Sequence, residues 1–229
     1  MKKIVSFFLC ASMIAIAPGC STMSKLAEGS LVGGGAGATV GAAVGAVAGK
    51  DAKSAGIGAA IGTVVGAGVG AIIGRQMDKK AAELAAIEAA KVETVEDANG
   101  LEAIKVTFDS GILFETNKCD LNAASKASLK DFAAKMVDLP ETDITIYGHT
   151  DNTGPDDFNE KLSLDRATSV YNYLSKCGIA KDRMVAEGKS YSMPVASNET
   201  REGRLQNRRV EIFISANEAM IEAAKAEGK

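Results

Sequence analysis

The apolar and polar positions of this 229-residue chain follow three different patterns, and each pattern predicts a different kind of structure. Residues 4–17 form a short apolar run without charge. Residues 31–74 consist mainly of glycine, alanine, valine and isoleucine around one polar bend. From residue 101 onward, alternating and helical apolar spacings follow one another, which is typical of a globular domain that contains both strands and helices.

In this third region the pattern predicts an α+β domain over residues 101–216. The predicted strands are 103–108, 112–114, 143–148, 183–187 and 209–214. The predicted helices are one that Asp120 or Asn122 caps and that ends near Val137, one from Pro155 to the stop at Gly178, and a short one over 199–206. The order of the main elements, β-α-β-α-β-β, predicts a mixed sheet with helices on one face.

The segments on either side of this domain have helical character. Residues 75–98 are rich in Ala, Glu and Lys, and Leu84 and Ile87 are spaced helically. This composition predicts a charged, solvated helix, which we assign as a helical linker over residues 75–100. Residues 217–229 are expected to form a ragged helical tail.

The beginning of the chain resembles a bacterial lipoprotein signal peptide. Two lysines precede the apolar run, and Pro18-Gly19-Cys20 follows it. This order predicts a signal peptide over residues 1–19, lipidation (including palmitate) at Cys20 and a lipid-anchored tether over residues 20–30. The position three residues before the cysteine is Ala17, where lipoproteins prefer leucine. The alternative is an ordinary secretory signal with a chance cysteine.

Two glycine ladders fill residues 31–74. Glycine recurs every fourth residue at Gly33, Gly37, Gly41, Gly45 and Gly49, and again at Gly58, Gly62, Gly66, Gly70 and Gly74. This spacing puts the glycines on one side of a helix, where two backbones can approach closely. As helices the two ladders would rise about 28 Å and about 31 Å, close to the ~30 Å hydrocarbon core of a membrane. We predict a helical hairpin inserted in the outer membrane. A flexible Gly/Ala-rich linker and a zipper that joins several chains, into a homo-oligomer or a pore, are the alternatives.

Charge and cysteines narrow the functional classes. The formal net charge of −3 becomes −5 when the two lysines of the signal peptide are removed, which gives no support for nucleic-acid binding. One histidine cannot build a His-rich metal site, and no cysteines have zinc-ligand spacing. Cys119 and Cys177 lie at opposite ends of the predicted helical layer, roughly 30 Å apart, so we predict that they do not form a disulfide.

Two long motifs carry a specific resemblance. The runs GHTDNTGPDDFNEKLSLDRATSVYNYL (residues 148–174) and GKSYSMPVASNETREGRLQNRRVEI (residues 188–212) closely resemble the OmpA-like peptidoglycan-binding domain family. The T-D-x-T-G, N-x-x-L-S-x-x-R-A and N-R-R-V-E elements occur in order and with the family's spacing. The resemblance covers roughly residues 103–215, and together with the glycine ladders the chain is similar to glycine-zipper outer-membrane lipoproteins.

The resemblance implies a binding site for diaminopimelate, the residue of the peptidoglycan stem peptide whose side-chain end bears an ammonium and a carboxylate. By this resemblance Asp151 binds the ammonium and Arg166 the carboxylate, which an arginine fork can hold in bidentate fashion. The resemblance also implies that Asn117, Thr153 and Asn159 form a neutral hydrogen-bonding wall.

Several residues in and near this predicted site allow other interpretations or differ from the family pattern. Thr116 stands where the family commonly has aspartate, which weakens one expected contact. Without the motif, Asp151 and Arg166 would be interpreted as a structural ion pair at a helix start. We expect Arg208 and Arg209 to brace the site or the sheet.

His149, beside Thr150 and Asp151, raises the question of catalysis. The chain has no catalytic cysteine motif, no G-x-S-x-G elbow and no metal cluster around this histidine, so we expect no enzyme activity and no cofactor. The expected function is a non-enzymatic tether in the cell envelope, anchored by lipid in the outer membrane with its C-terminal domain in the periplasm. The alternative function is a glycine-zipper oligomer or pore that wall binding positions.

Overall fold

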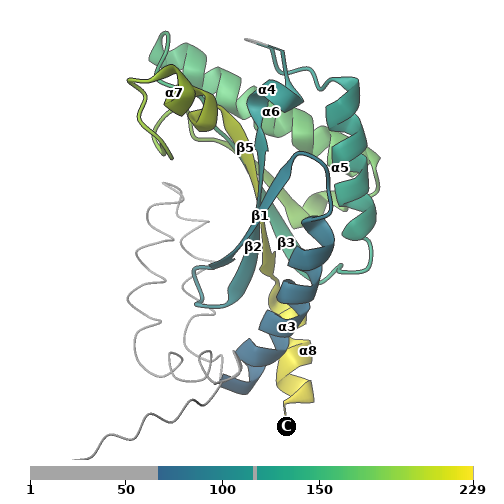
Figure 1. Cartoon of the computed structure of the whole chain (residues 1–229). Helices are drawn as coiled ribbons and strands as arrows, with labels where there is room; N and C mark the ends of the chain where they lie inside the picture. Colours follow the sequence, from purple (N-terminus) through teal and green to yellow (C-terminus); the bar gives the residue numbers. More distant parts are fainter. Residues whose placement is uncertain (1–66, 116–117, 229) are drawn as a thin grey trace, which may run out of the picture.

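The structure, a computed structural model, describes residues 67–115 and 118–228. At its centre lies a five-stranded sheet with the strand order β1-β2-β5-β3-β4 (Figure 1). The strands are β1 (Ala90–Glu96), β2 (Glu102–Asp109), β3 (Thr142–Gly148), β4 (Met184–Gly188) and β5 (Arg209–Ala216). β3 and β4 pair in parallel and the other neighbours are antiparallel, so the sheet is mixed, as predicted.

The long helices pack against one face of this sheet. The long ones are α3 (Ala67–Leu84), α5 (Ala123–Lys135), α6 (Asp156–Lys176) and α8 (Glu218–Glu227), and the short ones are α4 (Ser110–Leu113), η1 (Lys181–Arg183) and α7 (Arg201–Asn207). α5 and α6 lie side by side, and α8 lies beside α3 at the lower end of the view (Figure 1). The order β2-α5-β3-α6-β4-β5 confirms the predicted α+β arrangement.

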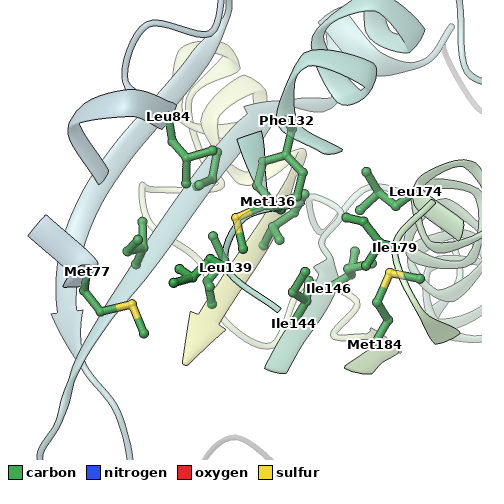
Figure 2. Close-up of a cluster of buried hydrophobic side chains, with 14 of the residues drawn as sticks. Met77, Leu84, Phe132, Met136, Leu139, Ile144, Ile146, Leu174, Ile179 and Met184 are labelled. Atoms are coloured by element: carbon green, nitrogen blue, oxygen red, sulfur yellow. The ribbon is translucent and has the colours of Figure 1, made fainter. Parts of the chain in front are cut away.

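A single hydrophobic core lies between the sheet and the helices. Val106, Ile212 and Ile146 stand opposite one another across β2, β5 and β3, and all three are fully buried. Phe132 of α5 and Leu174 of α6 are fully buried over this side of the sheet (Figure 2). Because side chains alternate between the two faces of a strand, the even-numbered positions of β2, β3 and β5 supply this core.

The predicted helix over residues 75–98 is wrong beyond Leu84. α3 ends there, Ala89 has a left-handed φ of 66°, and residues 90–96 form β1, which pairs antiparallel with β2. Nor is this segment a solvated spacer, because Met77, Leu84 and Ile87 are buried in the core. The ammonium of the buried Lys80 also donates to the carbonyl of Lys135 at the end of α5, over 2.7 Å. The sheet therefore gains an edge strand that the sequence pattern did not predict.

The end of the second glycine ladder also packs on the domain. Residues 67–74 belong to α3, where Val69, Ile72 and Ile73 are buried in the core. This differs from the expectation that residues up to 74 lie in a membrane. In the part of the chain that the structure describes, no helix combines the length and apolarity needed to cross a membrane. The first ladder, the rest of the second and Cys20 lie outside the described residues, so the hairpin, its alternatives and the lipid anchor stay predictions.

Two smaller differences concern residues 112–114 and the C-terminus. The predicted strand at 112–114 is a helical turn, α4, and only Phe114 makes an isolated bridge, to Leu121. The tail is an ordered helix, α8, whose Met220, Ile221 and Ala224 are buried against the core. The domain boundaries at residues 74, 100 and 216 stay predictions, although elements on both sides of residues 100 and 216 share one core.

Candidate functional site

The sequence motifs meet where β3 ends and β5 begins. Because these strands are antiparallel and Gly148 pairs with Val210, the loop after β3 lies beside the residues that precede β5. The amide of His149 donates to the carbonyl of Arg209 at 2.9 Å, which extends the pairing into the loop. This register brings Asp151, three residues after β3, next to Arg208, the residue before β5.

Helix α6 completes the site because it crosses the end of β3 at backbone distance. A Cβ on Gly148 would lie 2.0 Å from the carbonyl oxygen of Ser163, so this position tolerates only glycine. Arg166 lies less than one turn further along α6, near enough to Asp151 and Arg208 for their charges to affect its pKa. We call Asp151, Arg166 and Arg208 the charged site.

Asp151 is buried and has a partner at each carboxylate oxygen. Its Oδ1 accepts the backbone amide of Thr153 at 2.8 Å, and its Oδ2 accepts from Nη1 of Arg208. Burial works to raise the pKa of Asp151, but the hydrogen bonds from Thr153 and Arg208 outweigh it and hold the pKa below its ordinary value of 3.8. Asp151 is therefore a fixed anion at neutral pH.

Arg166 is buried and only partly satisfied. Its Nε donates to the carbonyl of Lys118 at 3.1 Å, and its guanidinium lies 5.3 Å from the centre of the Phe114 ring. Among the described residues, its buried Nη1 has no hydrogen-bond partner. Burial, and next the nearby charge of Arg208, lower the pKa of Arg166 below its ordinary value, yet an arginine stays charged at neutral pH. A buried cation with a free donor provides a binding position for an anion.

The predicted neutral residues have different surroundings. Asn159 is buried, and its Nδ2 donates to the carbonyl of Thr153 at 3.1 Å, so it fixes the loop that holds Asp151. Thr153 itself is exposed. Asn117 and Thr116 lie outside the described residues, and the role of Asn117 stays a prediction.

Sequence reasoning left open whether Arg208 braces the site or the sheet. Its side chain forms the ion pair with Asp151 and remains 34% exposed. The N-R-R-V-E motif contained the signal, since consecutive residues at the start of a strand point to opposite sides. Sequence alone could not show which of the two arginines faces Asp151.

Arg209, in contrast, belongs to a buried network with Glu211 and His149. Its Nε donates to Glu211 Oε1 at 2.7 Å, and its Nη atoms donate to the carbonyls of Asn207 and Met193. Burial works to raise the pKa of Glu211, but His149 and Arg209 outweigh it and lower this pKa to about 2. Arg209 thus braces the strand, as expected. We call His149, Arg209 and Glu211 the buried network.

His149 is buried beside Glu211, and among the described residues neither of its ring nitrogens has a hydrogen-bond partner. The side chain is 1% exposed, and its Nε2 is 3.5 Å from Glu211 Oε2. Burial lowers the pKa of His149, so the ring is neutral at neutral pH. Within the described residues no group of three or more His, Cys, Asp or Glu side chains could hold a metal ion.

The two cysteines of the domain are not bonded to each other, as predicted. Cys119 and Cys177 are both free thiols and both half-buried. β2 and β3 each run antiparallel to β5 and hence parallel to each other, so α5 and α6 start at the same edge of the sheet. Cys119 precedes α5 and Cys177 ends α6, which places them at opposite ends of the helical layer.

Comparison with known families assigns two regions of the chain. Residues 113–208 match the OmpA family, and residues 1–87 match the YMGG-like Gly-zipper family. The second match includes α3, which packs on the sheet.

Three curated relatives align with about half of the chain. Outer membrane porin F of Pseudomonas fluorescens is 39% identical over 50% of this chain and 35% of its own length. The probable lipoprotein YiaD of Escherichia coli is 36% identical over 49% of this chain and 51% of its own. The peptidoglycan-binding protein ArfA of Mycobacterium bovis is 39% identical over 49% of this chain and 35% of its own. The chain thus spans about a third to a half of the length of these relatives.

Two solved structures share the fold. The MotB-like protein of Desulfovibrio vulgaris has a TM-score of 0.57 at 22% identity, covering 65% of this chain and 99% of that one. The cell wall anchor of the type VI secretion system (T6SS) of Pseudomonas aeruginosa has a TM-score of 0.52 at 28% identity, covering 62% of this chain and 97% of that one. Residues 113–208 thus match the OmpA family in sequence and share the fold of these two structures, and they follow a segment that matches the YMGG-like Gly-zipper family.

Proposed function

We propose that this domain binds peptidoglycan without catalysis, through the diaminopimelate of the stem peptide. The observation that carries the proposal is the arrangement of the charged site. The free Nη1 of the buried Arg166 can receive a carboxylate, and the fixed carboxylate of Asp151 can receive an ammonium. Diaminopimelate presents these two groups on one carbon atom.

The relatives support a wall-binding role. One is named a peptidoglycan-binding protein, and a solved neighbour at 28% identity is described as a cell wall anchor. The relatives reported above carry the names of outer-membrane, lipoprotein or peptidoglycan-binding proteins, and none carries the name of an enzyme. A binding function also agrees with the buried position of His149, which has no access to a ligand.

The tether is the second part of the proposal. Lipid at Cys20 and the glycine-rich hairpin hold the N-terminal end in the outer membrane, while the domain binds the wall from the periplasm. The Gly-zipper match over residues 1–87 and the outer-membrane names of the relatives support this arrangement. Cys20→Ser is expected to move the protein out of the outer-membrane fraction, and an unchanged distribution would contradict the lipid anchor.

Pull-down on isolated sacculi tests the wall-binding part. Asp151→Ala and Arg166→Ala each remove one partner of a desolvated charge contact, which costs on the order of 2–5 kcal/mol of binding free energy. Either variant is therefore expected to lose most of its retention. The matched control is Arg201→Ala, which removes an exposed arginine at the start of α7. Wild-type retention of both site variants, with unchanged melting temperatures, would contradict this site.

A further inference from the structure

Cys119 is a free, half-buried thiol that lies beside Arg166. Nε of Arg166 donates to the carbonyl of Lys118 over 3.1 Å. Because consecutive Cα atoms are about 3.8 Å apart, Cys119 is a neighbour of this guanidinium. The electrostatics agree, since burial lowers the pKa of Arg166 most, whereas a negative charge on Cys119 acts to raise it. The thiol therefore lies at the edge of the charged site, and the proposed binding of the wall does not use it.

Arg166 is also the cation near Cys119 that keeps a free donor. Lys161 lies near this thiol as well, because a negative charge on Cys119 adds to the effect of Asp165 in raising the pKa of Lys161. Lys118 and Lys161 are exposed, however, and each pairs with a carboxylate, over 2.5 Å and 2.7 Å. Arg166 is 3% exposed, and among the described residues its Nη1 has no partner. An anion attached at Cys119 therefore has its strongest donor in Arg166.

Cys177 provides a comparison within the same chain. It is also free and half-buried, but it follows Arg166 by eleven residues, which is about 16 Å along the axis of α6. It lies beside Tyr173, whose pKa is raised by burial and next by the charge of Cys177. The two thiols therefore have similar exposure and different charged surroundings.

We propose that Cys119 is a modification site for small disulfides that carry a carboxylate, and that the attached carboxylate binds Arg166 and closes the charged site. The thiolate of Cys119 attacks one sulfur of the disulfide, whose S–S bond breaks while a new S–S bond forms to Cys119. The other half leaves as a thiolate, and the proton of Cys119 passes to solvent. Cys119 is thereby oxidised and the leaving half is reduced.

The attached group and the wall compete for the same donor. Nη1 of Arg166 is the position that we propose for the ligand carboxylate, so a carboxylate tethered at Cys119 occupies it at high effective concentration. A reducing agent removes the tethered group, which makes the closure reversible. The modification itself is independent of the wall ligand, and only its effect on wall binding rests on the proposed function.

Exchange rates with two reagents test the modification. Dithiodipropionate carries a carboxylate at each end, and cystamine carries an ammonium at each end. Peptide mapping by mass spectrometry follows Cys119 and Cys177 separately in the full chain. The ratio of the two rates at Cys119, divided by the same ratio at Cys177, cancels the intrinsic reactivities of the reagents. We expect this normalised ratio to favour the carboxylate by at least about tenfold, because a buried cation attracts one reagent and repels the other.

Two variants identify the cation that is responsible. Arg166→Gln should lower the normalised ratio to about threefold or less, because the buried charge is gone. Lys161→Gln, the matched control, removes an exposed cation that Asp165 already pairs with and should keep most of the ratio. The absence of a preference at Cys119 over Cys177 in the wild type would overturn the proposal, and so would a preference that only Lys161→Gln removes. If Arg166→Gln does not fold, the wild type and Lys161→Gln still decide.

Retention on isolated sacculi tests the closing of the site. The chain modified at Cys119 by dithiodipropionate should lose most of its retention and recover it on treatment with a reducing agent. Cys119→Ser should be retained with or without the reagent. Full retention of the modified chain would overturn the closing of the site, while the proposed function stands. If the untreated chain is not retained, the proposed function fails and the closing of the site fails with it, and the exchange rates alone decide whether Cys119 is the modification site.

Discussion

Arg208 and Arg209 are adjacent in the chain, but they enter two clusters with opposite properties. In the buried network, Arg209 is 3% exposed and each of its three nitrogens has an acceptor. In the charged site, Arg208 is partly exposed, and Arg166 keeps a buried donor without a partner. Both clusters lie at the same end of the sheet, so the backbone that supports them is nearly the same.

The difference separates a structural cluster from a binding cluster. A buried charge whose hydrogen bonds are all satisfied gains nothing from a further ligand, and removing one partner leaves an uncompensated charge. A buried donor without a partner is a cost to the free protein that a ligand can remove. The predictions below follow from this contrast, and each would be reversed if the roles of the two clusters were exchanged.

The largest expected effect is on stability and belongs to the buried network. Arg209→Leu leaves the carboxylate of Glu211 buried without its cation, so the free energy of unfolding should fall by about 3–5 kcal/mol. Urea unfolding followed by circular dichroism measures this. The double variant Arg209→Leu/Glu211→Leu removes both charges and should recover part of the loss. A single-variant loss below about 1 kcal/mol would mean that the network does not stabilise the fold.

The next effect is the acid sensitivity of the same network. The pKa of Glu211 is about 2 in the folded protein against an ordinary value of 4.5, so the folded state binds fewer protons than the unfolded state in that range. The stability from Glu211 is therefore present above pH 4.5 and is lost as the pH falls toward 2. The wild type should lose on the order of 2–3 kcal/mol over this range through Glu211.

A pH series of urea unfolding curves tests this. Glu211→Gln should flatten the dependence of stability on pH between about 4.5 and about 2. Glu160→Gln, which changes an exposed carboxylate on α6, should leave the curve as in the wild type. A wild-type slope in the Glu211→Gln variant would place the acid-sensitive group elsewhere.

The contrast between local and long-range contacts explains how much of this structure could be predicted from the sequence. The central elements could be predicted from local patterns. The side chain of Asn122 caps α5 by accepting a hydrogen bond from the backbone amide of Ser125. Gly178, with φ 104°, lies just after the end of α6. β1 could not be predicted in this way. Its sequence, AKVETVE, suits a helix as well as a strand, and pairing with β2 rather than local preference decides its structure.

The sequence predicted individual residues of the site, but not how these residues are arranged around one another. Asp151 and Arg166 lie close together because the register of β3 on β5 and the contact of Gly148 with α6 bring their segments together. Both are long-range contacts that no local pattern contains. The pairing of Asp151 with Arg208 rather than with Arg209 depends on which side of β5 each of these two arginines faces. A shift of one residue in the register of β5 would turn Arg209, and not Arg208, toward the side of Asp151.

The smallest expected effect on stability is at the charged site, and it is the most direct test of the difference between the two clusters. Arg208→Gln removes a partner of the buried Asp151, but Arg208 itself is 34% exposed and its loss leaves no unpaired buried arginine. The free energy of unfolding should therefore fall by about 1 kcal/mol, against about 3–5 kcal/mol for Arg209→Leu. Asp151 keeps its hydrogen bond from the amide of Thr153 in this variant and so retains one partner after the substitution. The measurement is the same urea unfolding curve at pH 7. A loss in Arg208→Gln as large as that in Arg209→Leu would show that both arginines hold the fold, and the division into a structural and a binding cluster would then be wrong.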